Sequence, residues 1–247
     1  MTTVIMNPFP GKIGKYEVIE EIGRGNMGTV YSATDPFSDR KVALKVAHRD
    51  KLDEMSAQRF RKLFFNEARA AGVLDHPNIL RIFDADMDGD LCYLVMELMQ
   101  DCDTLETACK PESLLSVREV VGIIYKLAKA LDYAHRQGVI HRDIKPSNIL
   151  LTAERDVKLA DFSVALVTRG DVAETQFQGF MGSPLYMSPE QIREEHVDSP
   201  SDIFSLGVVM YQLLTGQHPF RANSLGAVYE KITNEDPPAL TEYRRDG

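Results

Sequence analysis

The feature that most limits how this chain can fold is a glycine-rich stretch, Gly23-Arg-Gly-Asn-Met-Gly28, between two strand-like segments. Dinucleotide-binding units share the spacing Gly-x-Gly-x-x-Gly, but in them a helix follows the glycines directly. Here the run Val30-Tyr-Ser-Ala-Thr34 follows, with the alternation and β-branched residues of a strand. The glycines therefore join two strands. By themselves they fit either a plain hairpin turn or a loop whose backbone amides bind phosphate.

The pattern of the chain changes near residue 100. Before this point, short strand patterns surround one helix, whose apolar residues recur from Phe60 to Leu74 until His76-Pro77 ends it. The expected strands cover residues 16–22, 30–34, 41–47 and 91–98. This part of the chain therefore predicts a strand-rich lobe.

Helices dominate beyond residue 105. A capping box at Ser116-Val-Arg-Glu119 predicts the start of one long helix, with Gly138 as its C-cap. A second helix is expected from near Ser201 to Thr215, followed by Gly216. The whole pattern predicts an α+β fold with a cleft where the two parts join, a common place for ligand sites.

Composition excludes several classes of protein. The chain has 247 residues, of which 44% are hydrophobic and 26% charged, so it is globular rather than disordered. A net charge of −9 argues against sequence-independent nucleic-acid binding and against a polybasic membrane contact. Cys92, Cys102 and Cys109 form no CxxC pair, which argues against a zinc site or a disulfide framework. With no membrane-spanning run and no signal-peptide pattern, the expected location is the cytoplasm.

A lysine inside an apolar strand gives the glycine loop a chemical context. Val42-Ala-Leu-Lys45 follows the loop closely, and burying an ammonium group is costly unless an anion lies beside it. Glu67, on the inner face of the predicted helix, is the candidate carboxylate, and phosphate oxygens would be a second anion. The alternative is an exposed lysine at a strand edge.

Two further motifs complete an ordered set. They are His141-Arg-Asp143-Ile-Lys145-Pro-Ser-Asn148 and Asp161-Phe162-Ser163, and Ser188-Pro-Glu190 follows them. With the glycine loop, Lys45 and Glu67, this series resembles the eukaryotic-type (Hanks-type) protein kinases, most closely the bacterial Ser/Thr kinases. The resemblance runs from roughly residue 12 to residue 236. It implies a bilobal kinase fold with a tail at 1–11, a small lobe at 12–99 and a large lobe at 100–247.

The resemblance also implies a reaction, the transfer of the γ-phosphoryl group of Mg-ATP to Ser or Thr hydroxyls of proteins. In it, Asp143 accepts or orients the proton of the substrate hydroxyl, and Lys145 neutralises charge on the transferred group. Lys45 contacts the α- and β-phosphates and pairs with Glu67. Phosphoryl transfer needs little covalent chemistry from the protein, so cations and carboxylates that hold cations suit it.

Cofactor and nucleotide contacts follow from the same resemblance. Asn148 and Asp161 would hold Mg²⁺. Met96 resembles the gatekeeper, and residues 97–99 resemble the hinge that contacts adenine. The full set expected to bind ATP is Ile22, Gly23, Gly25, Gly28, Val30, Ala43, Lys45, Met96, Glu97, Met99 and Leu150.

Substrate choice and regulation are further implications. Lys145 and the hydroxyl of Ser183 match the Ser/Thr-directed branch, whereas Ser147 and Gln212 stand where arginine-selective relatives have glutamates. A strong requirement for arginine is therefore not expected. The segment from 163 to 188 is expected to be regulatory and phosphorylated by the kinase itself. Its candidate residues are Thr168, Thr175 and Ser183, with Arg142 as the phosphate partner.

The sequence departs from the family pattern in two places, and these departures favour an alternative function. Ser163 replaces a glycine, at a strain of about 1–3 kcal/mol if a positive φ is needed there. The resemblance implies further helices, and an arginine that pairs with Glu190, beyond residue 247; the alternative partners of Glu190 in this sequence are Arg244 and Arg245. The expectation is an incomplete large lobe with apolar surface exposed on 201–215 and around 228–232, which a homodimer could cover. The alternative function is a pseudokinase that binds nucleotide or acts as a scaffold.

Overall fold

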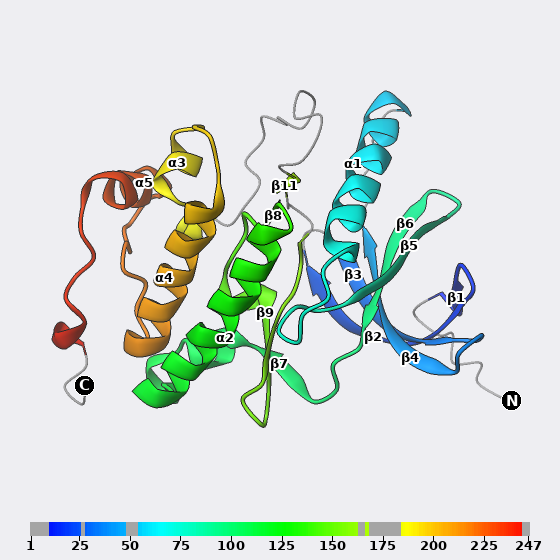
Figure 1. Ribbon diagram of the computed structural model, residues 1–247, viewed down its shortest axis with the longest axis horizontal. Helices are drawn as coiled ribbons and strands as arrows, with labels where there is room; N and C mark the ends of the chain where they lie inside the picture. The colour runs from blue at the N-terminus through cyan, green and yellow to red at the C-terminus, as the bar shows by residue number, and fades with distance from the viewer. Residues whose placement is uncertain (1–9, 26–27, 48–53, 163–165, 168–183, 244–247) are drawn as a thin grey trace, which may run out of the picture. The chain divides into compact units, whose positions relative to one another are not determined.

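The chain forms two compact units in a computed structural model that describes residues 10–25, 28–47, 54–162, 166–167 and 184–243 (Figure 1). The first unit holds Met1–Val73 and Arg81–Met99. The second holds Leu74–Leu80 and Gln100–Gly247. Leu74–Leu80 thus groups with the second unit, although it lies within the stretch 12–99 expected to form the small lobe.

Hydrogen bonds explain why this short segment belongs to the second unit. The Leu80 amide donates to the Leu159 carbonyl at 2.8 Å, and the Leu159 amide donates to the Asn78 carbonyl at 2.8 Å. The Asn78 side-chain amide also donates to the Val157 carbonyl at 2.8 Å. The segment is therefore added to a strand of the second unit as a short parallel bridge.

The first unit is one antiparallel sheet with a helix. Its strand order is β1-β2-β3-β4-β6-β5, and α1 (Glu54–Gly72) contacts β5 and β6. The strands are β1 (Lys12–Ile13), β2 (Tyr16–Gly25), β3 (Gly28–Asp35), β4 (Arg40–Ala47), β5 (Ile82–Asp88) and β6 (Leu91–Glu97). Alternate residues of the middle strands bury one face of this sheet in a core that includes Tyr31, Val42, Leu44, Tyr93 and Val95.

The edge strand β5 has no counterpart among the strands predicted from the sequence. Its exposed positions are Asp84, Asp86 and Asp88, and aspartate is among the residues least common in strands. Charges on an edge strand prevent pairing with other chains. The aspartates that protect this edge also lower the strand propensity of the segment, which is why the sequence pattern did not predict this strand.

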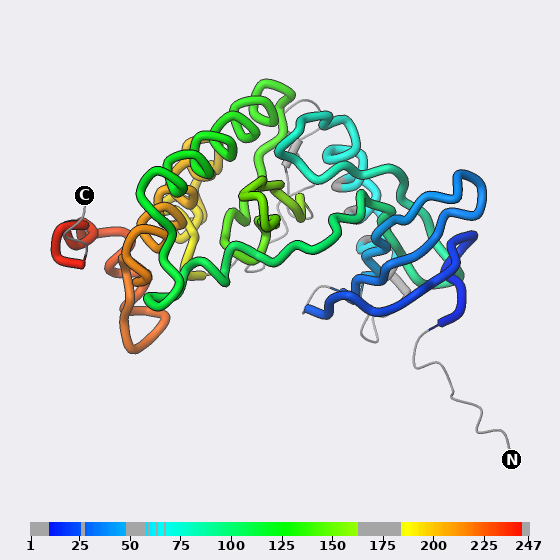
Figure 2. Tube along the Cα trace, turned by 90° about the horizontal axis from the view of Figure 1, so that it is seen from below, coloured from blue at the N-terminus to red at the C-terminus, as the bar shows by residue number. Residues whose placement is uncertain are grey.

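The second unit contains the remaining helices, and both views show α2 and α4 side by side (Figures 1 and 2). The α-helices are α2 (Val117–Arg136), α3 (Pro189–Ile192), α4 (Ser199–Thr215) and α5 (Leu225–Asn234). The strands are β7 (Cys102–Thr104), β8 (Val139–Ile140), β9 (Ile149–Thr152), β10 (Val157–Leu159) and β11 (Leu166–Val167). Short 3₁₀ helices are η1 (Leu105–Ala108), η2 (Pro111–Ser113), η3 (Pro146–Asn148), η5 (Pro184–Tyr186) and η6 (Leu240–Glu242).

The predicted helix ends are largely confirmed. Ser116 and Glu119 form the capping box of α2, and Gly216 caps α4 with a φ of 70°. The C-cap of α2 is Gln137 rather than Gly138, which follows it with a φ of 78°. Within the described part of the chain, no helix has both the length and the apolar character needed to cross a bilayer.

The predicted exposure around residues 228–232 is wrong. Val228 and Ile232 are 3% and 4% exposed, because α5 packs its apolar side against Val208 and Phe220. On α4 the prediction is met at one position, Ile203, which is 51% exposed. The apolar side of α5 is therefore covered by α4 and by the residues between the two helices.

Candidate active site

The segment that follows β8 carries the motif residues His141 to Asn148 of the second unit. His141 is fully buried, and its Nδ1 accepts the Asp143 amide proton at 3.2 Å. Because Nδ1 is an acceptor, the proton of the ring lies on Nε2, which donates to the Ala160 carbonyl at 3.0 Å. The ring also contacts Phe162, with centroids 4.5 Å apart. His141 thus holds both Asp143 and the residues around Asp161 in place.

The Asp143 carboxylate is 4% exposed and is oriented by two neighbours. Its Oδ2 lies 2.7 Å from the Lys145 ammonium and accepts a hydrogen bond of 3.0 Å from the Asn148 Nδ2. The same Nδ2 donates to the Asp143 carbonyl at 2.8 Å. A buried carboxylate is stable only with such partners. Asp143 is therefore a carboxylate of fixed orientation that can accept a proton, with the Lys145 ammonium beside it.

Asn148 and Asp161 have the donor atoms that Mg²⁺ prefers. The two hydrogen bonds of the Asn148 side chain both use its Nδ2, which leaves the amide oxygen as a possible ligand. The Ala160 amide donates to the Asn148 carbonyl at 2.8 Å, so the residue before Asp161 is fixed against Asn148. Asp161 itself has a φ of 64°. One amide and one carboxylate oxygen fit Mg²⁺, which usually completes its shell with water and phosphate oxygens.

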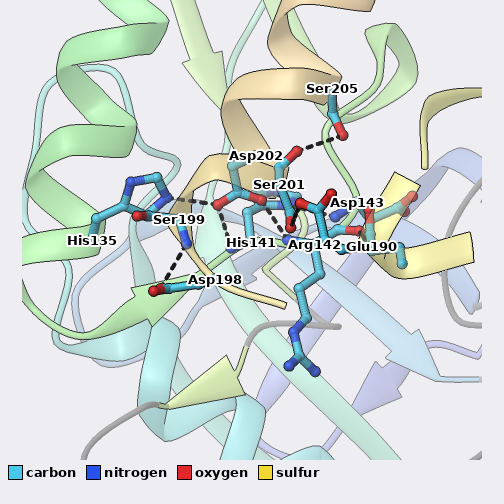
Figure 3. Close-up of polar contacts among 11 residues, drawn as sticks. His135, His141, Arg142, Asp143, Glu190, Asp198, Ser199, Ser201, Asp202 and Ser205 are labelled. Atoms are coloured by element: carbon cyan, nitrogen blue, oxygen red, sulfur yellow. Dashed lines mark hydrogen bonds and ion pairs between the residues drawn. The ribbon is translucent and has the colours of Figure 1, made fainter. Parts of the chain in front are cut away.

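A buried carboxylate on α4 supports the backbone of this loop (Figure 3). Asp202 is 1% exposed, and it accepts the amides of His141 at 2.9 Å and Arg142 at 2.8 Å. Its Oδ2 also lies 2.7 Å from His135 Nε2 at the end of α2. The N-cap of α4 is Asp198, not Asp202. Asp202 therefore acts as a brace for the loop and not as a helix cap.

Arg142 adopts a φ of 68° and is fixed through its backbone. Its amide binds Asp202, and its carbonyl accepts the Gln191 side-chain amide at 3.0 Å. Its side-chain Nε is buried and has no hydrogen-bond partner among the described residues. Burial lowers the pKa of the Arg142 guanidinium, while the Asp202 carboxylate acts in the opposite direction.

Glu190, in the short helix α3, is connected to α4 by a side-chain hydrogen bond. Ser188 and Gln191 form a capping box on the short helix α3. The expected partners of Glu190 were an arginine beyond residue 247, Arg244 or Arg245, and the last two lie outside the described residues. The structure instead shows the Ser201 hydroxyl donating to Glu190 Oε1. A serine of α4 thus supplies a donor for this carboxylate.

Replacing Ser201 by alanine should lower the free energy of unfolding by about 1–3 kcal/mol, because Glu190 loses a charge-assisted hydrogen bond. The melting temperature should fall by several degrees. A double-mutant cycle with Glu190→Ala measures the coupling, since each single change removes the same bond. Coupling within error of zero would show that the bond adds nothing to stability.

The first unit places four predicted ATP contacts on one face of its sheet. Val30 pairs directly with Lys45, and Ala43 pairs directly with Met96, so their side chains lie on the same side. Lys45 in turn pairs with Leu94. This face is opposite the core face of the sheet, because residues alternate along a strand.

The remaining predicted residues differ in how far the structure describes them. Gly23 pairs with Val30, and a Cβ on Gly28 would lie 2.3 Å from the Val46 carbonyl oxygen, so this glycine is needed for close strand packing. Ile22 is 46% exposed. The Glu97 amide donates to the Arg81 carbonyl at 2.9 Å. Met99 ends the first unit, Gly25 and Leu150 lie in strands, and Glu67 lies in α1.

Some predictions fall outside the described residues. These are Ser163, Thr168, Thr175 and Ser183, together with the side chain of Glu67. The predicted pairing of Lys45 with Glu67 and of Arg142 with a phosphothreonine therefore remain predictions.

Sequence reasoning missed several residues that hold the site together. His135, Gln191 and Ser201 each bond to a partner that local pattern cannot identify, since two of these partners are about fifty residues or more away along the chain. The one available signal was the place of His135 in the last turn of α2, where a helix terminus favours a basic side chain.

Comparison with known proteins agrees with this geometry. Residues 16–243 match the family described as the protein kinase domain. The chain is 38% identical over 237 residues to a probable serine/threonine-protein kinase PknB of Bifidobacterium longum, covering 91% of this chain and 34% of that protein. It is 35% identical over 230 residues to the serine/threonine-protein kinase PrkC of Bacillus subtilis, covering 93% of this chain and 35% of that protein.

A third relative is the serine/threonine-protein kinase PknB of Mycobacterium leprae, 36% identical over 227 residues, with 90% of this chain and 36% of that protein covered. The chain spans about a third of the length of these relatives. The motif residues lie along the chain in the order that the resemblance required. The chain belongs to the protein kinase domain family.

Proposed function

We propose that this chain is a protein serine/threonine kinase that transfers the γ-phosphoryl group of Mg-ATP to Ser and Thr hydroxyls. The observation that carries this is the buried Asp143 carboxylate, held by Lys145 and Asn148 on a loop that Asp202 braces. The names of the three relatives support the same reaction class.

The second unit supplies the groups for the chemical step. Asp143 accepts or orients the proton of the substrate hydroxyl, because the two bonds at its Oδ2 fix the orientation of the carboxylate. Lys145, 2.7 Å from that oxygen, offers positive charge to the transferred phosphoryl oxygens. Asn148 and Asp161 would hold Mg²⁺, which when bound neutralises phosphate charge.

The first unit supplies nucleotide contacts. Lys45 is the only charged residue of the four on the face described above, and it is assigned to the α- and β-phosphates. Val30, Ala43 and Met96 give an apolar surface that suits the adenine ring. The substrates are ATP and proteins with accessible Ser or Thr, and the place of action is the cytoplasm.

The alternative is a pseudokinase that binds nucleotide without useful turnover, and it rests on Ser163 in the position of a glycine. Both functions predict ATP binding, so binding does not separate them. Turnover that depends on Asp143 does, since a scaffold needs no proton acceptor.

The test is transfer of radiolabel from ATP to a protein substrate by the wild type and by Asp143→Asn. Asp132→Asn is the matched control, because Asp132 lies on the surface of α2 and pairs with Arg136 at 3.0 Å. We expect label with the wild type and the control, none above background with Asp143→Asn, and loss of transfer when Mg²⁺ is chelated. Equal transfer by Asp143→Asn would contradict the assignment.

Regulation through Arg142 is part of the proposal. Its buried Nε lacks a partner among the described residues, and a phosphate group is the acceptor that matches a guanidinium best. Thr175 is the first candidate for that phosphate, with Thr168 and Ser183 next.

We therefore expect phosphate in the segment 163–188 after incubation with Mg-ATP, and weaker activity in Thr175→Ala. Mass spectrometry of the incubated chain measures this, with Asp143→Asn as the inactive control. Finding no phosphate on any residue of the segment would contradict self-activation.

A further inference from the structure

The side-chain amide of Gln191 has a hydrogen-bond partner at each of its two ends. Its Oε1 accepts the Ser188 amide proton at 3.0 Å, and its Nε2 donates to the Arg142 carbonyl at 3.0 Å. The two ends cannot be exchanged, because a backbone amide only donates and a carbonyl only accepts. One side chain thus completes the cap of α3 and also reaches the His141–Asn148 loop, 49 residues away along the chain.

The peptide unit between Arg142 and Asp143 is held at both of its polar groups. Its carbonyl, which belongs to Arg142, accepts the hydrogen bond from Gln191. Its N–H, which belongs to Asp143, donates to His141 Nδ1 at 3.2 Å. A peptide unit is planar, so holding its C=O and its N–H fixes the orientation of the whole plane, which includes the Asp143 Cα. The direction in which the Asp143 side chain leaves the backbone therefore depends on both Gln191 and His141.

The backbone of Arg142 needs this support. Its φ of 68° lies in the left-handed region, where the Cβ of an L-residue comes too close to the carbonyl oxygen. Such a conformation persists only where the surrounding structure holds it. The Arg142 amide is bound by Asp202 at 2.8 Å (Figure 3), and the Arg142 carbonyl is bound by Gln191. Loss of the Gln191 bond would therefore let the next peptide unit rotate and turn the Asp143 side chain with it.

We propose that Gln191 is a positioning residue for phosphoryl transfer: its Nε2 holds the Arg142 carbonyl, and with it the peptide unit that directs the Asp143 carboxylate. This inference rests on the proposed kinase activity. Gln191 acts through Asp143 and takes no part in the chemical step itself. A small misplacement of a reacting group can lower the rate of a reaction strongly. The effect of Gln191 is therefore expected in the rate of transfer and not in the binding of ATP or peptide.

Two substitutions separate the two ends of the Gln191 amide. Gln191→Glu keeps an oxygen for the Ser188 amide, but it places a second acceptor against the Arg142 carbonyl, where two acceptors repel each other. Gln191→Lys keeps a donor that can reach the Arg142 carbonyl, but it has no acceptor for Ser188. The proposal requires the rate of transfer to follow the donor, whereas the stability of the α3 cap follows the acceptor.

The measurement is the single-turnover rate of phosphoryl transfer to a Ser-containing peptide at saturating Mg-ATP. We expect Gln191→Glu to lower this rate at least about tenfold, which corresponds to one lost hydrogen bond. Its Kd for ATP and its KM for peptide should stay within about twofold of wild type, and its melting temperature should be close to that of wild type. Gln191→Lys should keep the rate within about threefold of wild type and melt a few degrees lower, because the cap is weakened.

Gln137→Glu is the matched control, because it is the same substitution at an exposed glutamine at the end of α2. It should leave the rate of transfer unchanged. A rate within about threefold of wild type in a folded Gln191→Glu would overturn the role of Gln191. So would equal losses of rate in the two Gln191 variants, because they would indicate a general structural effect. Absence of transfer by the wild type itself would instead refute the proposed kinase activity.

Discussion

Replacing Asp202 by alanine should lower the free energy of unfolding by about 3–5 kcal/mol and abolish most phosphoryl transfer. The carboxylate accepts the amides of His141 and Arg142 and the ring of His135. Its removal leaves buried donors unpaired, at about 1–3 kcal/mol for each. A domain typically has a free energy of unfolding of about 5–15 kcal/mol, so this substitution would remove a large share of the stability.

The matched control is Asp198→Ala. Asp198 is the N-cap of the same helix, four residues earlier, but it is exposed, and its side chain accepts the Ser199 amide at 2.7 Å. Loss of this N-cap should cost about 0.5–2 kcal/mol and leave activity near wild type. Denaturant unfolding and the transfer assay measure both effects. If Asp202→Ala matches Asp198→Ala in stability and activity, Asp202 does not brace the loop.

Replacing Lys45 by methionine should reduce phosphoryl transfer at least a hundredfold while the protein stays folded. Methionine has a similar length and fits the apolar face that Lys45 shares with Val30. What is lost is a positive charge for phosphate, and loss of one such preorganised group typically costs about 10²–10³ in rate.

Lys41→Met is the control for this change, since Lys41 lies on the same strand and the same side, at an exposed position. We expect it to keep wild-type activity. Circular dichroism and the transfer assay on both variants give the comparison. Activity of Lys45→Met within tenfold of wild type would remove Lys45 from the site.

Local pattern was enough for the main helices. The capping box at Ser116 and the positive-φ Gly216 mark helix ends through short-range hydrogen bonds and backbone sterics, which depend on neighbouring residues only. The edge strand β5 was not predicted because its exposed aspartates, which keep the edge from pairing with other chains, have a low propensity for strands.

The site was recoverable only in part. The residues of the His141–Asn148 loop stand close together in sequence, so their roles followed from the motif. The bonds from Asp202 to that loop and to His135 connect distant parts of the chain, which the spacing of residues along the sequence does not predict. The Glu190–Ser201 bond and the Gln191–Arg142 bond depend on how α3 packs, which sequence spacing does not contain.

The most direct test of the central claim is phosphoamino-acid analysis of a protein substrate incubated with the chain and radiolabelled Mg-ATP. The account predicts phosphoserine and phosphothreonine with the wild type, no phosphotyrosine, and no label with Asp143→Asn. Label found only on tyrosine would contradict the assigned substrate class. No label with the wild type, under conditions in which it binds ATP, would contradict the kinase itself.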